Sequence, residues 1–223
     1  LGQLEKAELA KHGAALAGLL ADSDEDVRRA VVTVLGQLEK AELAKHGAAL
    51  AGSLADYDAN VRRAVVTVLG QLEKAELVKH GATLVGKLAD SHEDVRETVV
   101  TVLGQLEKAE LANHGAALVH LLEHSDANVR KAVVTVFGQL ETAELAVHGA
   151  TLVGKLADSD EDVRETVVTV LGQLEKAELA KHGAALVGLL ADSAEHSEED
   201  SAAAAQSTAG KQSRGVNCFQ GGS

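Results

Sequence analysis

The sequence repeats itself with a period of 34 residues. The pentapeptide Leu-Gly-Gln-Leu-Glu opens the copies that start at residues 1, 35, 69, 103 and 171, and the copy that starts at residue 137 has Phe in place of the first Leu. The first two copies differ at only four of their 34 positions, which recent duplication or consensus engineering would both explain. Because a unit this short cannot bury a core by itself, the period predicts copies that stack on their neighbours into a solenoid.

Each period has the pattern of two helices separated by a turn. The first helix is expected over residues 6–21, where apolar and small residues recur at helical spacing: Leu9, Gly13, Leu16 and Leu20. The turn over residues 22–24 ends in Asp, a favourable N-cap. The second helix is expected over residues 25–38, with an inner face formed by Val27, Ala30, Val31, Val34, Leu35 and Leu38. The pattern predicts an all-α chain of about eleven helices, five pairs and one extra first helix.

The turn and the second helix carry the most specific pattern. An Asp in the turn is followed by Val-Arg and by an apolar run that ends in Leu-Gly over residues 20–36, and Val-Arg recurs at residues 61–62, 95–96, 129–130 and 163–164. This pattern resembles the HEAT repeat, in a short variety related to armadillo and PBS-lyase repeats, over residues 1 to about 192. The resemblance implies a right-handed α-solenoid of antiparallel helix pairs. A 34-residue period also suits tetratricopeptide repeats, but their Trp, Tyr, Phe and Pro landmarks are missing.

In the HEAT family a turn Asp and a second-helix Arg form a ladder between neighbouring repeats. The resemblance assigns this structural role to Asp22, Asp56, Asp90, Asp158, Arg28, Arg62, Arg96, Arg130 and Arg164. His124 breaks the Asp series in the fourth copy and is expected to interrupt the ladder there.

Glycines recur at three fixed positions of the repeat, those of Gly13, Gly18 and Gly36, which account for 17 of the 21 glycines. A glycine inside a helix costs up to ~1 kcal/mol relative to alanine. Repetition of that cost predicts close contact between helices at these positions. Copying by duplication alone is the alternative.

The sixth copy loses its second helix. Beyond residue 192 both Val-Arg and the apolar run are absent, and Ser, Ala, Gln, Glu and Gly dominate as far as residue 223. We expect one solenoid domain over residues 1–192 and a disordered tail over residues 193–223. The uncapped last repeat would expose apolar surface, through which end-to-end self-association is one expectation.

Charge excludes several classes of partner. Lys and Arg number 21 against 34 Asp and Glu, for a formal net charge of −13, so we expect neither nucleic acid nor a membrane as partner. The lone Cys218 cannot form an intrachain disulfide, which favours a reducing compartment, and we expect an intracellular, cytoplasmic location. The chain starts at Leu1 without an initiator Met, and we expect it to be a segment of a longer protein.

Histidines stand at one position of every copy, each four residues after a Glu: His12, His46, His80, His114, His148 and His182. Residues at this spacing share a helix face, so the pairs are expected at the surface and protonation is expected to favour folding in mild acid. The fourth copy adds His120 and His124, a spacing that suits a metal ion, but a closed zinc site needs four ligands. No third ligand matches, so we expect neither a metal nor any other cofactor.

The exposed side of the second helices is the expected partner surface. The position of Arg29 alternates in charge from the second copy onward: Arg29, Arg63, Glu97, Lys131 and Glu165. This alternation follows a 68-residue super-repeat and predicts a face without a strong field of one sign. Tyr57 and Arg63 are the expected anchors, because Tyr and Arg are enriched among residues that dominate binding energy.

These observations favour a non-enzymatic scaffold that binds another protein. The sequence has no phosphate-binding loop, nucleophile elbow or Cys/His arrangement, so we assign no catalytic residue. One alternative is a consensus-like or engineered array without a native partner. Another is a fragment related to the HEAT-like lyases or hydroxylases, which the lone His92-Glu93 pair disfavours.

Overall fold

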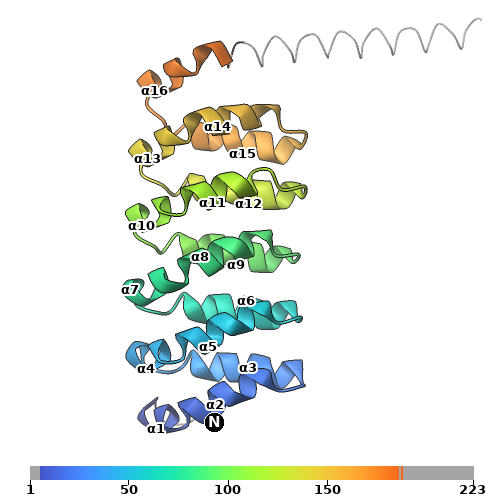
Figure 1. Cartoon of the computed structure of the whole chain (residues 1–223), viewed down its shortest axis with the longest axis vertical. Helices are drawn as coiled ribbons and strands as arrows, with labels where there is room; N and C mark the ends of the chain where they lie inside the picture. Colours follow the sequence, from blue (N-terminus) through green and yellow to red (C-terminus); the bar gives the residue numbers. More distant parts are fainter. Residues whose placement is uncertain (1–5, 186, 188–223) are drawn as a thin grey trace, which may run out of the picture. The chain divides into compact units, whose positions relative to one another are not determined.

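The computed structural model describes residues 6–185 and residue 187, and these residues form helices joined by turns, without a β-strand (Figure 1). The chain forms two compact units that divide after Glu175. In the second unit the structure describes α16 (Lys176–Lys181) and the few residues after it. The tail expected over residues 193–223 lies outside the described residues.

The second helices of the repeats form one layer of the first unit. In chain order they are α3 (Glu25–Leu35), α6 (Ala59–Leu69), α9 (Glu93–Leu103), α12 (Ala127–Phe137) and α15 (Glu161–Leu171). Each helix packs on the next one in this series. The stacked solenoid that the 34-residue period predicts is therefore confirmed within residues 6–175.

The first helices form the other layer, but each is broken into two α-helical pieces where we expected one continuous helix. The pieces are α1 (Lys6–Lys11) and α2 (Gly13–Gly18), α4 (Lys40–Ala44) and α5 (Gly47–Gly52), α7 (Lys74–Leu77) and α8 (Gly81–Gly86), α10 (Lys108–Ala112) and α11 (Gly115–Leu121), and α13 (Thr142–Val147) and α14 (Gly149–Gly154). Short 3-10 helices adjoin them: η1 (Leu19–Ala21), η2 (Ser53–Ala55), η3 (Val78–His80), η4 (Lys87–Ala89) and η5 (Lys155–Ala157). The described residues thus hold 16 α-helices rather than about eleven.

The break falls at the histidine that recurs in each copy. The N–H of His12 donates to the carbonyl of Leu9, only three residues back, and the helix restarts at Gly13. A bond of this span tightens the turn, and the φ of −100° at His12 lies outside the usual helical range. Helix periodicity continues through the break, which is why the sequence pattern alone did not reveal it.

The second helices begin and end at polar signals in the sequence. The carboxylate of Asp24 accepts hydrogen bonds from the N–H groups of Asp26 and Val27, which satisfies two free donors of the first turn. At the other end the N–H of Gln37 donates to the carbonyl of Val34, so the helix tightens after residue 35. The helix is therefore three residues shorter than the expected range of 25–38.

Leucine and valine side chains fill the space between the two layers. Leu35, Leu50, Val65 and Leu69 are fully buried, and Phe137 is the one aromatic residue in the described core. Complete burial of such a side chain contributes about 1.5–3 kcal/mol. Val168 in α15 is 60% exposed, whereas its equivalents Val32, Val66 and Val134 are buried, so the first unit carries apolar surface on its last second helix.

The recurring glycines divide into two kinds. A Cβ on Gly36 or Gly70 would lie 2.8 Å from a valine methyl of the next repeat, so close approach of helices requires glycine there. A Cβ on Gly18, or on its equivalents Gly52, Gly86 and Gly154, would meet no atom within 4 Å. The prediction of close contact is right for the first kind and wrong for the second, where duplication is the sufficient explanation.

Candidate interaction surface and the ladder between repeats

An Arg in each of three repeats reaches the turn Asp of the next repeat. Arg28 binds Asp56 through Nε and Nη2 at 2.6 and 3.0 Å. The same paired geometry joins Arg62 to Asp90 at 2.8 and 2.7 Å, and Arg130 to Asp158 at 2.8 and 2.6 Å. The structure therefore brings these predicted residues together, and we call each such pair a rung.

Each rung is held by further hydrogen bonds within its turn. The Nη1 of Arg62 donates to the carbonyls of Asp56 and Tyr57, and the carboxylate of Asp90 accepts the N–H of His92. Burial alone would raise the pKa of Asp90, but the bonds from Arg62 and His92 outweigh it and hold the pKa below its ordinary value. For Asp158 the bond from Arg130 is the largest influence and lowers the pKa.

The ladder is interrupted where the sequence places His124. This imidazole accepts the N–H of Asp126 at Nδ1, at 3.1 Å, as the turn Asp does in other repeats. It offers no carboxylate, and Arg96 forms no rung: its guanidinium makes one hydrogen bond within the described residues, to the carbonyl of Asp90 at 2.7 Å. Within the described residues, Arg96 therefore has no carboxylate partner at the position where His124 replaces the turn Asp.

The end members of the predicted ladder also form no rung within the described residues. The carboxylate of Asp22 accepts the N–H of Asp24 at 2.9 Å, and no earlier repeat of the chain supplies an Arg. Arg164 donates to the carbonyl of Asp158 at 2.6 Å, and the Asp that follows in register, Asp192, lies outside the described residues.

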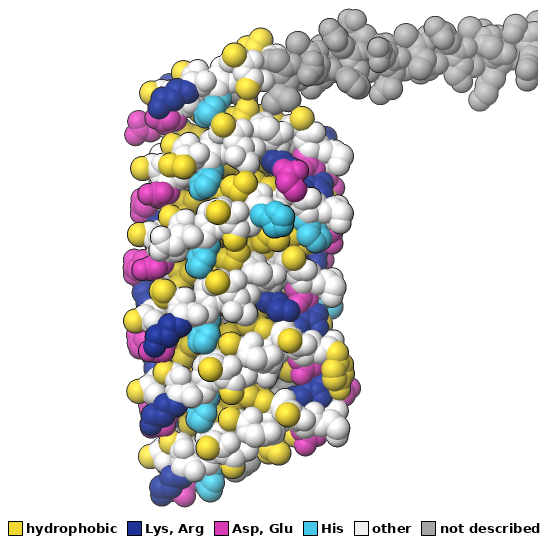
Figure 2. Space-filling view, viewed as in Figure 1, with side chains coloured by type: hydrophobic (Ala, Val, Ile, Leu, Met, Phe, Trp, Pro, Cys, Tyr) yellow, Lys and Arg dark blue, Asp and Glu magenta, His cyan; other side chains and the backbone are white. Residues whose placement is uncertain are grey.

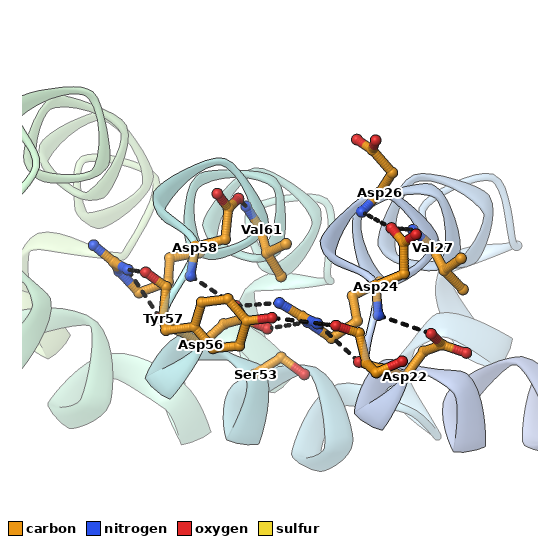
Figure 3. A network of polar contacts seen from close by, with 12 residues as sticks. Asp22, Asp24, Asp26, Val27, Ser53, Asp56, Tyr57, Asp58 and Val61 are labelled. Carbon is orange, nitrogen blue, oxygen red and sulfur yellow. Dashed lines mark hydrogen bonds and ion pairs between the residues drawn. The ribbon is translucent and has the colours of Figure 1, made fainter.

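Tyr57 lies across the first rung, as Figure 3 shows. Its hydroxyl donates to the carbonyl of Ser23 at 3.2 Å, and the guanidinium of Arg28 lies 4.5 Å from its ring centroid. The residue is nevertheless 75% exposed. One side of the ring therefore supports the neighbouring turn and the rest remains open to solvent.

The recurring histidines form a column along the first unit in Figure 2. Four of them, His46, His80, His114 and His148, pack over the glycine of the preceding repeat: a Cβ on Gly13 would lie 2.5 Å from Nε2 of His46, and a Cβ on Gly81 would lie 2.6 Å from Nε2 of His114. The expected Glu–His pairs are therefore wrong. Four of the glutamates instead bind a lysine three residues later, as Glu42 binds Lys45 at 2.6 Å.

For two of these histidines, packing also reverses the expected response to acid. Burial lowers the pKa of His80, although Glu76 opposes it, and burial lowers the pKa of His148 against the influence of Glu144. The neutral imidazole is the form that fits between neighbouring repeats, because protonation would place a positive charge against buried backbone. The ring of His148 also lies 4.9 Å from that of Phe137.

The predicted partner surface lies on the exposed side of the second helices, and its basic residues are paired. Arg29 binds Asp26 of its own helix at 2.6 Å, whereas Arg63 binds Asp94 at 3.4 Å and Lys131 binds Asp162 at 2.9 Å, both across to the next repeat. Glu97 and Glu165 form no ion pair with the described residues. From the second repeat onward, the face thus has paired and unpaired charges in alternate repeats.

Two hollows lie between neighbouring helices on this face. One of about 610 Å³, between α3 and α6, is lined by Arg29, Arg63 and the threonines beside them. The other, of about 230 Å³ between α9 and α12, is lined by residues that include Arg96, Glu97 and Lys131. Four of the five alternating residues therefore border a depression.

The edge formed by the loops between repeats carries a second charged series that the sequence analysis did not identify. Lys6 binds Glu39 at 2.9 Å and Lys40 binds Glu73 at 3.0 Å, and the pairs Lys74–Glu107 and Lys108–Glu141 continue the series. The sequence carried evidence for this series, because the Lys and the Glu recur at fixed positions of the repeat. Their separation by 33 residues concealed the pairing, since adjacency depends on how the repeats stack.

Metal ligation is not supported by the arrangement of ionisable side chains. The described residues hold no group of three or more His, Cys, Asp or Glu side chains placed to bind a metal ion. His120 is exposed, and His124 uses Nδ1 in its own turn. Within the part of the chain that the structure describes, no helix is long and apolar enough to cross a bilayer.

Comparison with known proteins agrees with this architecture. Residues 13–80 match the family model described as HEAT repeats. No curated protein matches the sequence. Among solved structures the chain is similar to one from the Pds5–Scc1 complex, with 17% identity, 77% of this chain and 31% of that chain covered, and a TM-score of 0.52.

A second similar structure is the complex of CpcE and CpcF of phycocyanin lyase from Nostoc sp. PCC7120, with 16% identity, 72% of this chain and 98% of that chain covered, and a TM-score of 0.50. At such identities the likeness shows the fold alone. The family match shows HEAT repeats over residues 13–80, and the 34-residue period and the rungs continue the same all-helical solenoid fold through the described residues of the first unit.

Proposed function

We propose that this solenoid is a scaffold that binds another protein on the exposed side of its second helices. The observation that carries the proposal is the row of charged side chains that borders hollows on this face, with Arg29 and Arg63 at one hollow and Glu97 and Lys131 at the other. Neighbouring second helices offer an extended surface of this kind because each repeat adds the same face one step further along the stack.

The solved structures with the same fold support a protein partner in general. The Pds5–Scc1 and CpcE–CpcF structures are both complexes between proteins. Charge on the second helices of this chain would act chiefly on partner selection and association rate, because exposed ion pairs add little affinity. The exposed part of Tyr57, at the edge of this face, supplies the aromatic surface that binding anchors commonly use.

Reversal of charge on one face tests the proposal. The double variant Arg63→Glu and Lys131→Glu changes the second-helix face, and the control Lys11→Glu and Lys45→Glu makes the same change in net charge on the first helices. All four residues carry exposed ion pairs, so both variants should retain the helical circular-dichroism spectrum. Each would be used with the unaltered chain to capture partners from the lysate of the source organism.

The proposal predicts that the second-helix variant loses partners that the unaltered chain and the control variant both retain. Equal retention by both variants, or equal loss from both, would contradict binding through this face. Tyr57→Ala provides a separate arm, because it removes an exposed ring without any change in charge. We expect it to weaken capture of the same partner.

A further inference from the structure

The interrupted rung leaves a guanidinium in an unusual state. Arg96 is 5% exposed, similar to Arg28, Arg62 and Arg130, yet it lacks the carboxylate that each of those residues binds. A buried charge without a partner is strongly unfavourable, so such groups are normally paired. Within the described residues, Arg96 is the buried member of the ladder series without an acidic partner on its guanidinium.

The two nitrogens of Arg96 that remain free are the pair that binds Asp in the other repeats. Its Nη1 donates to the carbonyl of Asp90, but Nε and Nη2 donate to no described residue. Neither nitrogen is sealed from solvent, since Gln139 Oε1 is the only fully enclosed side-chain polar atom without a partner in the described part of the chain. The planar fork that matches a carboxylate is therefore unused, and it is not completely enclosed.

His124 keeps the gap open. Its Nδ1 is committed to the N–H of Asp126 at 3.1 Å, so the imidazole replaces the part of the turn Asp that caps the chain but not the part that binds Arg. The carboxylate of Asp126 is close enough to Arg96 for the positive charge of the guanidinium to affect its pKa. Its pKa is lowered chiefly by the N–H of Asn128, which donates at 2.8 Å, and less by Arg96, and it forms no ion pair with the guanidinium.

A hollow between α9 and α12, on the exposed face of the second helices, has Arg96 in its lining. Its volume of about 230 Å³ is several times the ~30 Å³ that a water molecule occupies in the liquid, so it has room for a carboxylate group. Arg96, Asn128 and Lys131 line it with side chains that carry hydrogen-bond donors, and Glu93 and Glu97 line it with acids. Lys131 is already paired with Asp162, which leaves Arg96 as the cation without a partner.

We propose that the gap between Arg96 and His124 is a binding site for a carboxylate group, which completes the fourth-repeat rung from outside the chain. A carboxylate matches the fork because its two oxygens reproduce the geometry of Asp56, Asp90 and Asp158 on their arginines. Glu93 and Glu97 repel free anions, so a small carboxylate binds weakly. An acidic side chain on a partner that is already docked gains effective concentration and binds more strongly.

Arginine side-chain NMR tests the site without knowledge of any partner, and so separately from the proposed function. The Nε–H signals of Arg96 and Arg62 would be followed while sodium acetate replaces sodium fluoride at constant ionic strength. Arg62 is an internal control in the same molecule, because Asp90 occupies its fork. We expect a saturable shift of the Arg96 signal in the millimolar range and no comparable shift at Arg62.

Two variants are expected to have opposite effects on acetate binding: one removes a binding site and the other creates one. His124→Asp supplies the missing carboxylate and should abolish the acetate response of Arg96. Asp90→His opens a second gap and should create an acetate response at Arg62, provided that its helical spectrum is retained. A linear shift of equal size at both arginines, or a response of Arg96 that persists in His124→Asp, would overturn the proposal.

Discussion

Addition of a single methyl group to Gly70 tests how closely the repeats are stacked. Gly70 follows α6 and has φ −63° and ψ −13°, a conformation that any residue adopts. A Cβ there would lie 2.8 Å from Cγ2 of Val102 in the next repeat and 3.3 Å from the carbonyl of Thr67. Space between helices, and not backbone conformation, therefore requires glycine at this position.

The size of the effect follows from this distance. Carbon atoms in ordinary contact lie about 3.5–4.0 Å apart, so the new methyl would overlap the valine by at least about 0.7 Å. Val102 is 3% exposed, and valine has one strongly preferred rotamer in a helix, so the side chain cannot turn away. Overpacking costs about 1–3 kcal/mol and alanine regains up to ~1 kcal/mol of helix propensity. We expect Gly70→Ala to lower the free energy of unfolding by about 1–2 kcal/mol.

Gly86→Ala is the matched control. Gly86 ends α8 with φ −59°, and a Cβ there would meet no atom within 4 Å. This variant should stabilise the chain by about 0.5–1 kcal/mol, through helix propensity alone. Urea unfolding followed by circular dichroism would compare the three transition midpoints, since repeat arrays need not unfold in a single step.

The double variant Gly70→Ala and Val102→Ala separates overlap from other causes. Removal of the valine methyls leaves room for the new methyl, so the two substitutions together should be less destabilising than the sum of their separate effects. A midpoint of Gly70→Ala at or above that of the unaltered chain would refute the close stacking described here. Strict additivity in the cycle would refute the assignment of the effect to Val102.

Three further predictions follow from the contacts between repeats. Folding stability should fall as the pH drops below about 6.5, because burial lowers the pKa of His80 and His148 and the unfolded chain then binds more protons than the folded chain. Thermal melts at pH 7.5 and 5.5 measure this effect, and a higher melting temperature at pH 5.5 would contradict it. Asp90→Ala should cost about 3–5 kcal/mol in urea unfolding, because it leaves Arg62 buried without its carboxylate, and a loss below 1 kcal/mol would show that the rung is dispensable. Lys40→Ala should change stability by less than about 0.5 kcal/mol in the same assay, because its ion pair with an exposed Glu is solvated.

Much of the fold follows from the sequence because helix boundaries are determined by residues close to them in the chain. The caps at Asp24 and its equivalents and the apolar stripe of each second helix act within one turn or one face of a helix. The break within the first helices was missed, since helical periodicity runs through it and the bend at His12 brings the glycine that follows it against the next repeat.

The candidate surface was predicted in part. The positions of Arg63, Glu97 and Lys131 on an exposed face follow from helical projection, but their ion pairs depend on the offset between neighbouring helices. The absence of a rung partner in the fourth copy was visible as His124. That Arg96 stays buried all the same, with its fork open to a hollow, required the packed structure.

The sequence by itself determined the period, the helix pairs and the family of the repeat, because these depend on the order of residues within 34 positions. Tertiary structure decided what the residue at each recurring position contacts. Gly70 is held against Val102 while Gly86 faces open space, and the histidines pack on glycine rather than pair with glutamate. The physical reason is that contacts between repeats join residues 28 to 39 positions apart, and their geometry is set by how closely two helices approach.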